Sequence, residues 1–429
     1  MIQKERIVEK KYLLPFILIT SLFALWGFAN DITNPMVAAF KSLMEISNAK
    51  ASMIQLAFYG GYATMAIPAA LFVRRFDYKK GILLGLALYA TGALMFWPAA
   101  RFEAFGFFLV SLYVLTFGLA FLETTANPFI LSLGSEKTAT RRLNLAQSFN
   151  PMGSLLGMFV ASRVILATLE SEKRNAAGEL IFPTLDEATK AAIRTSDLMI
   201  IRDPYVALGL VVIVMFVIIA LVKMPQTGHS EQSSAGDSFK RLVKNKVYRE
   251  GVLAQVFYVA AQIMCWTFII QYAERLGIPK ATAQLYNIGA MGMFLVSRFI
   301  STFLMKYVNS RRLLMIFAMG GMATMTGTIL IDGMGGLYCL LATSAFMSLM
   351  FPTIYGIALE GIGEDASLGA AFLVMAIVGG ALMPPIQGAI IDLGQVGRLP
   401  AENASFILPF ISFCVIAIYG RRSFLAMKT

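Results

Sequence analysis

Residues 105–133 read FGFFLVSLYVLTFGLAFLETTANPFILSL and contain a single charged side chain, Glu123. An α-helix of about 20 mostly apolar residues is long enough to cross the hydrocarbon core of a membrane. This stretch exceeds that length, and its apolar residues are too continuous to leave a face for water. It therefore predicts a transmembrane helix that carries an acid and an amide, Asn127, within it.

The composition of the whole chain extends this prediction. Of its 429 residues, 58% are hydrophobic and 14% are charged, and the mean hydropathy is +0.70. Soluble domains have about 25% charged residues, so a soluble fold is excluded. The net charge of +11 lies in short clusters between apolar runs. Such clusters orient membrane helices, and we expect no nucleic-acid partner.

Twelve segments are apolar and long enough to span a bilayer, which predicts an all-α membrane protein with twelve transmembrane helices. In chain order, these predicted spans are residues 13–39, 51–73, 81–100, 104–133, 143–168, 204–222, 250–273, 281–305, 313–331, 335–361, 367–391 and 403–420.

Lys and Arg gather in the N-terminal tail, in alternate connections and in the C-terminal tail. The connection after residues 51–73, for example, carries Arg74, Arg75, Lys79 and Lys80. Basic residues are enriched in the cytoplasmic loops of membrane proteins. We therefore expect a multi-pass protein with both termini in the cytoplasm.

The chain is expected to consist of two similar halves. Residues 223–249 are first rich in Ser and Gln and then basic, and they predict a cytoplasmic linker between six-helix bundles at 1–222 and 250–429. A shift of 224 residues places Asn127-Pro128 on Phe351-Pro352. A parallel duplication of this kind, with a substrate site between the halves near the midplane, is the architecture of the major facilitator superfamily.

Three spans repeat a pattern of neighbouring polar side chains followed by a proline. An ionisable group costs about 2.5–3.5 kcal/mol at the bilayer centre, so a functional role is favoured for the acids. Amides often hydrogen-bond between membrane helices, and this structural interpretation is favoured for each single Asn or Gln. The polar residues are Asn30, Asp31 and Asn34; Glu123 and Asn127; and Gln147 and Asn150.

Glu123 is the clearest candidate for coupling to protons. The 224-residue shift places Met347 at the equivalent position of the second half, so the fold does not require an acid there. A buried carboxylate is disfavoured in its charged form, so its protonation can follow access to solvent or the binding of substrate. Asp31 is the second candidate.

The polar lining suits a neutral sugar. Asn and Gln supply hydrogen-bond donors and acceptors in pairs, and an aromatic ring covers the apolar face of a pyranose. Trp26 and Trp266 lie within predicted spans and are candidates for such rings, with packing between helices as an equal alternative. Gln262 is a further polar candidate in the second half.

The chain offers no signature of an enzyme or a metal site. Its one histidine, His229, lies in a polar connection, and its three cysteines lie in apolar stretches. No glycine-rich phosphate loop or nucleophile motif is present. We therefore predict a protein that is not an enzyme and that needs neither a metal nor another cofactor.

Several motifs together resemble the fucose–galactose–glucose:proton symporter family of the major facilitator superfamily, in particular its L-fucose permeases. They are SLFALWGFAN at 21–30, FYGGYATMAIPAAL at 58–71, GLAFLETTANPF at 118–129, RRLNLAQSFNPMGSLLG at 141–157, QIMCW at 262–266 and SAFMSLMFPTIY at 344–355. The resemblance implies import of a monosaccharide with protons across a bacterial inner membrane by alternating access. It also implies a central site of Glu123, Asn127, Gln147 and Asn150.

Two departures from the family pattern bear on the substrate. Fucose permeases carry an acid at the position of Asn34, three residues after Asp31, and a tyrosine at the position of Phe351. With Phe346, Met347 and Met350 nearby, Phe351 predicts an apolar wall. That wall suits the C6 methyl group of L-fucose, which we take as the substrate of a monomeric symporter in the bilayer.

Other functions stay open at this point. A glucose or galactose symporter driven by H⁺ or Na⁺ is the main alternative, because an acid among amide oxygens also suits a sodium ion. A drug antiporter on the same fold is disfavoured, since such a pocket is expected to be apolar and aromatic. A receptor that has lost transport is disfavoured by the two retained acids.

Overall fold

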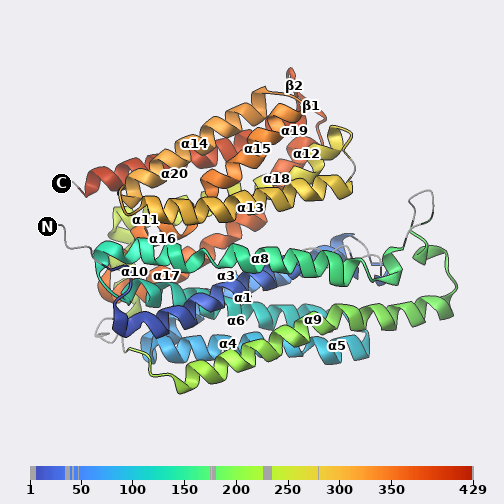
Figure 1. Ribbon diagram of the computed structural model, residues 1–429, viewed down its shortest axis with the longest axis horizontal. Coiled ribbons are helices and arrows are strands. Elements are labelled where there is room, and N and C mark those ends of the chain that lie inside the picture. The colour runs from blue at the N-terminus through green and yellow to red at the C-terminus, as the bar shows by residue number, and fades with distance from the viewer. Residues whose placement is uncertain are drawn as a thin grey trace. The chain divides into compact units, whose positions relative to one another are not determined.

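The computed structural model describes residues 6–33, 39–40, 43–46, 48–173, 175, 180–225, 234–278 and 280–427. These residues are almost entirely helical (Figure 1). Within them, 12 helical segments are long and apolar enough to cross a membrane, which confirms the predicted fold class. The segments are Lys10–Thr33, Leu56–Arg75, Tyr78–Phe102, Phe105–Ser132, Glu136–Leu166, Glu187–Leu221, Lys246–Arg275, Thr282–Leu304, Ser310–Leu330, Met334–Leu359, Gly363–Ile391 and Ala401–Ala426.

The elements have the following bounds. The α-helices are α1 (Leu13–Thr33), α3 (Asn48–Arg75), α4 (Tyr78–Leu94), α5 (Phe96–Phe102), α6 (Phe105–Ser132), α7 (Ala139–Gln147), α8 (Asn150–Phe159), α9 (Glu187–Leu221), α10 (Ala235–Lys244), α11 (Lys246–Thr267), α12 (Ile269–Arg275), α13 (Lys280–Leu304), α14 (Ser310–Leu330), α15 (Met334–Met347), α16 (Met350–Leu359), α17 (Ala366–Met375), α18 (Gly379–Ile391), α19 (Ala401–Ser405) and α20 (Ile407–Ala426). The other elements are a π-helix, η3 (Val160–Leu166), short 3₁₀ helices, and a small antiparallel pair, β1 (Gln395–Val396) and β2 (Leu399–Pro400).

One span starts earlier than the sequence predicts. The apolar run at 204–222 is the second part of α9, which begins at Glu187. The Asp186 side chain accepts a hydrogen bond from the Thr189 backbone N–H at 3.1 Å and so caps the helix. The first turns of α9 are charged, and hydropathy alone did not include them.

Two spans are broken where a proline follows. The α7–α8 break precedes Pro151, and the α15–α16 break precedes Pro352. Proline has no N–H to donate and its ring clashes with the preceding turn, so a helix kinks or stops there. Both breaks place polar backbone atoms inside predicted spans.

Contacts divide the chain into two compact units. Unit 1 contains Met1–Phe16, Asn127–Pro151 and Thr227–Thr429, and unit 2 contains Ile17–Ala126 and Met152–Gln226. In unit 1, α14 packs against α15 and α20. In unit 2, α9 packs against α4 and α5. The division into halves at 1–222 and 250–429 stays a prediction.

A close crossing of α1 and α8 organises unit 2. A Cβ atom on Gly153 would overlap the Ala24 carbonyl, and one on Gly157 would crowd the Phe28 carbonyl at 2.7 Å. Small residues four apart let membrane helices approach to backbone contact. Ser154, which lies between these glycines, is thereby brought to the surface of α1.

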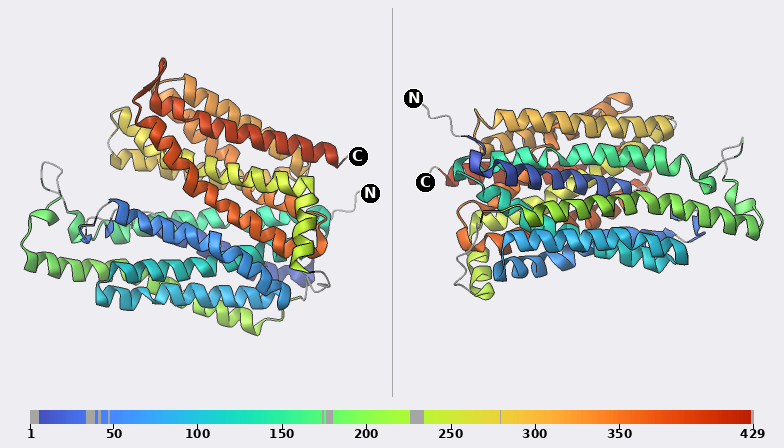
Figure 2. Two further views of the ribbon diagram at one scale, coloured as in Figure 1. Left: turned by 180° about the vertical axis from the view of Figure 1, so that it is seen from behind. Right: turned by 60° about the horizontal axis from the view of Figure 1, so that its bottom comes forward.

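In unit 1 the linker helix α10 runs across the direction of α11, as Figure 2 shows in yellow-green in its left panel. Arg241 of α10 forms an ion pair with Asp365. A cavity of about 300 Å³ lies beside this pair and is lined by Arg241, Asn245, Glu364 and Asp365, among others. Its lining includes none of the predicted site residues.

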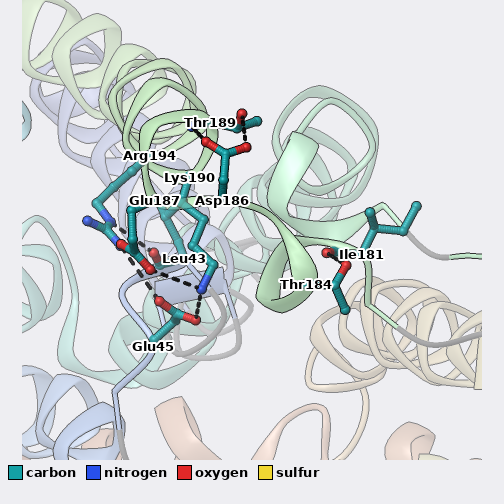
Figure 3. A network of polar contacts seen from close by, with 9 residues as sticks. All are labelled: Leu43, Glu45, Ile181, Thr184, Asp186, Glu187, Thr189, Lys190 and Arg194. Atoms are coloured by element: carbon teal, nitrogen blue, oxygen red, sulfur yellow. Dashed lines mark hydrogen bonds and ion pairs between the residues drawn. The ribbon is translucent and has the colours of Figure 1, made fainter.

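A charged network ties the start of α9 to the chain between α1 and α3 (Figure 3). Lys190 is only 7% exposed, and its Nζ atom lies 2.9 Å from Glu45 Oε1 and 3.5 Å from Glu187 Oε1. Arg194 donates to the Leu43 carbonyl at 3.2 Å and lies 3.8 Å from Glu45. Because Lys190 is buried, its ammonium group has lost water contacts, and the ion pairs with Glu45 and Glu187 compensate for that loss.

We expect Lys190→Met to lower the free energy of unfolding by about 1–3 kcal/mol, because Glu45 then loses a charged hydrogen bond. Thermal unfolding of the purified protein in detergent measures this effect. Lys173→Met is the matched control, since Lys173 is 64% exposed in its pair with Glu170, and such pairs contribute little. Equal melting temperatures for the two variants would contradict the role assigned to the network.

Candidate functional site

Unit 1 brings together two of the amides predicted from sequence. The Gln147 Nε2 atom donates to Asn127 Oδ1 at 2.9 Å, and both side chains are buried. Gln147 ends α7, and Asn127 lies in the last turns of α6. Asn150, the first residue of α8, is half-buried three positions further on. The amides therefore gather at a helix break.

A second polar pair next to this break was not identified from sequence. Asn144, three residues before Gln147, donates to Thr353 Oγ1 of α16 at 3.1 Å. Both side chains are buried. Asn144 shares a helix face with Gln147 at that spacing, which was the available signal. This pair fixes α7 against α16, close in sequence to Phe351.

The aromatic candidates of unit 1 lie on α11 and α16. Trp266 is half-buried, and its Nε1 atom donates to Ser344 Oγ at 3.1 Å. The Phe294 ring meets it edge-on, with ring centres 5.0 Å apart. Gln262 lies one turn before Trp266, is half-buried, and makes no side-chain hydrogen bond within the described residues.

Phe351 packs with two tyrosines and not with Phe346, which the predicted apolar wall placed beside it. Its ring centre lies 6.2 Å from those of Tyr258 and Tyr355. Phe346 instead packs against Gly320 and Phe317 of α14, because it lies in α15, on the other side of the α15–α16 break from Phe351. The wall beside Phe351 is thus formed by tyrosines, and the Tyr258 hydroxyl is buried without a hydrogen-bond partner in the part of the chain described.

Unit 2 contains both acids. Asp31 accepts a hydrogen bond from Ser154, which the α1–α8 crossing places beside it. Tyr59 of α3 interacts electrostatically with Asp31, and Tyr62, one turn on, interacts with Glu123. Asp31 forms no ion pair within the described residues. The sequence did not single out the two tyrosines or Ser154.

The remaining candidates of unit 2 lie on α1. Trp26 is 1% exposed and meets Phe23 edge-on, with ring centres 4.3 Å apart. Its burial favours the packing interpretation of its ring. Trp26 Nε1 and Asn30 Oδ1 are nevertheless buried polar atoms that find no hydrogen-bond partner among the described residues. Asn34 lies outside the described residues.

Comparison with known proteins agrees with this arrangement of helices. The model of the Major Facilitator Superfamily matches residues 17–384. The chain belongs to the Major Facilitator Superfamily. It is therefore a transporter and not an enzyme.

Individual relatives cover nearly the whole chain. An L-fucose-proton symporter of Haemophilus influenzae is 65% identical over 425 residues, which are 99% of each protein. A glucose/galactose transporter of Brucella abortus is 30% identical, over 96% of this chain and 94% of its own. The crystal structure of a fucose:proton symporter of Escherichia coli has a TM-score of 0.86 at 32% identity, covering 96% of this chain and 99% of that one.

These findings confirm two expectations from the sequence. The family resemblance is correct, and the chain is a multi-pass membrane protein with the major facilitator fold. The roles of individual side chains stay predictions.

We expect Gln147→Leu to lower the melting temperature of this transporter, because it removes the donor that bonds to the buried Asn127 Oδ1 atom. Gln262→Leu is the matched control, since the Gln262 side chain makes no hydrogen bond to any residue that the structure describes. In the double variant with Asn127→Leu, part of the loss should be recovered, because neither polar group is then left unpaired. Additive losses in this cycle would contradict the pairing.

Proposed function

We propose that this chain is an L-fucose–proton symporter that imports its sugar by alternating access. The observation that carries the proposal is the 65% identity to an L-fucose-proton symporter over 99% of both chains. The Escherichia coli fucose:proton symporter, which shares the fold at 32% identity, supports it independently.

We place the protein in the bacterial inner membrane as a monomer with both termini in the cytoplasm. The relatives are bacterial. The basic clusters in alternate connections support this orientation, because Lys and Arg are enriched on the cytoplasmic side.

The amides of unit 1 are proposed to bind the sugar hydroxyls. The bond between Gln147 and Asn127 uses one Nε2 proton, so the Gln147 amide keeps a second proton and its Oε1 atom. Asn150 and Gln262 add two half-buried amides. Trp266, held by Ser344, is proposed to cover the apolar face of the pyranose. Asn30, Asn34 and Trp26 are proposed as further sugar ligands from α1 and the chain that follows it.

The acids of unit 2 are proposed to carry the coupled proton. Glu123 is half-buried in α6 and has a tyrosine, Tyr62, as its electrostatic neighbour, while Asp31 has Ser154. An ionised acid is costly inside a membrane. Protonation removes that cost, which makes each acid suited to bind and release a proton during transport.

The glucose/galactose transporters are the second candidate, since one of them is 30% identical over most of the chain. The much higher identity to the L-fucose-proton symporter favours L-fucose. Phe351 supports L-fucose as the substrate, because its ring offers no hydroxyl group to the C6 end of the sugar.

The proposal is tested by uptake of radiolabelled L-fucose, D-galactose and D-glucose into proteoliposomes. We expect accumulation of L-fucose when the outside is acidic, and only equilibration without a pH gradient. Accumulation that requires a sodium gradient at fixed pH would contradict proton coupling. Preferential accumulation of glucose would contradict the assigned substrate.

For Glu123→Gln, we expect gradient-driven accumulation to disappear while exchange of labelled for unlabelled L-fucose partly survives. Glutamine keeps the shape and the hydrogen-bonding groups of the side chain but cannot titrate. Asp31→Asn is expected to impair both accumulation and exchange strongly, because its carboxylate is held by Ser154 at the α1–α8 crossing. Full accumulation by Glu123→Gln would rule out this residue as the proton carrier.

For Phe351→Tyr, we expect the preference for L-fucose over D-galactose to narrow. An apolar wall rejects an added hydroxyl by no more than about a hundredfold, and a new hydroxyl beside it supplies a partner. Competition for L-fucose uptake by unlabelled D-galactose measures the change. Phe346→Tyr is the control, because Phe346 packs against α14. An unchanged preference for L-fucose over D-galactose in Phe351→Tyr would contradict the placement of Phe351 in the sugar site.

A further inference from the structure

Two prolines near the candidate sugar site each deprive a backbone carbonyl of its usual donor. In an α-helix the carbonyl of residue i accepts from the N–H of residue i+4. Pro151 therefore leaves the Gln147 carbonyl without a helical partner, and Pro352 does the same to the Ser348 carbonyl. Both lie inside membrane spans, where an unsatisfied backbone group costs several kcal/mol.

One side chain supplies both missing hydrogen bonds. Arg298 of α13 donates from Nη1 to the Gln147 carbonyl at 3.0 Å and from Nε to the Ser348 carbonyl. The side chain is 3% exposed. It takes part in none of the ion pairs that join the described residues. Its hydrogen bonds thus go to the two backbone carbonyls that the prolines leave without an N–H donor.

Arg298 also contacts the aromatic residues near the site. Its guanidinium carbon lies 4.5 Å from the centre of the Phe294 ring, one turn earlier on α13. Phe294 in turn meets Trp266 edge-on. Arg298 bonds to the backbone carbonyl of Gln147, and the side chain of the same Gln147 donates to Asn127. Arg298 therefore joins the amides at the α7–α8 break to the aromatic residues of α11.

We propose that Arg298 is a positioning residue for sugar binding, which replaces the N–H groups missing at Pro151 and Pro352. It holds the two broken helices so that Gln147, Asn150 and Phe351 keep a fixed geometry. Guanidinium suits this task, because its donors form a rigid planar fork, whereas a lysine ammonium has one nitrogen on a flexible stem. The assignment of the bound sugar rests on the proposed function.

The prolines themselves allow a specific test. In Pro151→Ala the new N–H can reach the Gln147 carbonyl, so the bond from Arg298 becomes redundant. Pro352→Ala does the same for Ser348. Pro384→Ala is the matched control, because Pro384 lies inside α18 and the carbonyl that it frees, at Gly380, is not an acceptor of Arg298.

The experiment measures the L-fucose dissociation constant by calorimetry, and the melting temperature, for Arg298→Met and Arg298→Lys in each proline background. We expect Arg298→Met to weaken sugar binding by about tenfold or more, since two charged hydrogen bonds are lost. Arg298→Lys should recover part of the loss. The loss of L-fucose affinity caused by Arg298→Met should be smaller in the Pro151→Ala and Pro352→Ala backgrounds. It should be unchanged in the Pro384→Ala background.

An equal loss in all backgrounds would overturn the proposal, because Arg298 would then act by some means other than these carbonyls. Unchanged sugar binding by Arg298→Met would overturn it as well. If Arg298→Met does not fold, the same cycle with Arg298→Lys gives the answer. If the unaltered protein binds no L-fucose, the proposed substrate is wrong, and the coupling in melting temperature still tests the role of Arg298.

Discussion

Inside a membrane, each polar group must find its partner within the chain, because the hydrocarbon offers none. The helices satisfy most of the backbone, and two of the exceptions lie at Pro151 and Pro352. There Arg298 supplies the donors that proline lacks. The same constraint pairs Gln147 with Asn127 and Asn144 with Thr353. The arrangement around the breaks in α7–α8 and α15–α16 follows from this requirement.

The constraint also separates structural from functional polar residues. The buried amides Gln147 and Asn127 pair with each other without a substrate, and we propose that the remaining polar groups of Gln147 bind the sugar. The acids differ, because Asp31 and Glu123 have hydroxyl-bearing neighbours, Ser154 and Tyr62. The ionised form of such an acid is costly inside the membrane, which favours protonation. A transporter can use a group of this kind to bind and release protons.

Sequence reasoning predicted most of the fold, because a continuous apolar run such as residues 105–133 allows few structures other than a membrane helix. Spacing and the prolines that follow identified Asn127 and Gln147 as polar residues of two separate spans, and the family resemblance implied that they share one site. Sequence reasoning missed Ser154, because only the glycine crossing with α1 places that residue beside Asp31. It misplaced Phe346, whose direction depends on the α15–α16 break, and it could not assign Arg298, whose acceptors are backbone atoms far away in sequence.

If this protein is a symporter, L-fucose and protons enter together, and a pH electrode in the external medium measures this. L-fucose is added to a lightly buffered suspension of de-energised cells or proteoliposomes that contain this protein, with no imposed gradient and no sodium. The account predicts that the external medium becomes alkaline as L-fucose enters, and that D-mannitol has no effect. Entry of L-fucose without any change in external pH would contradict it.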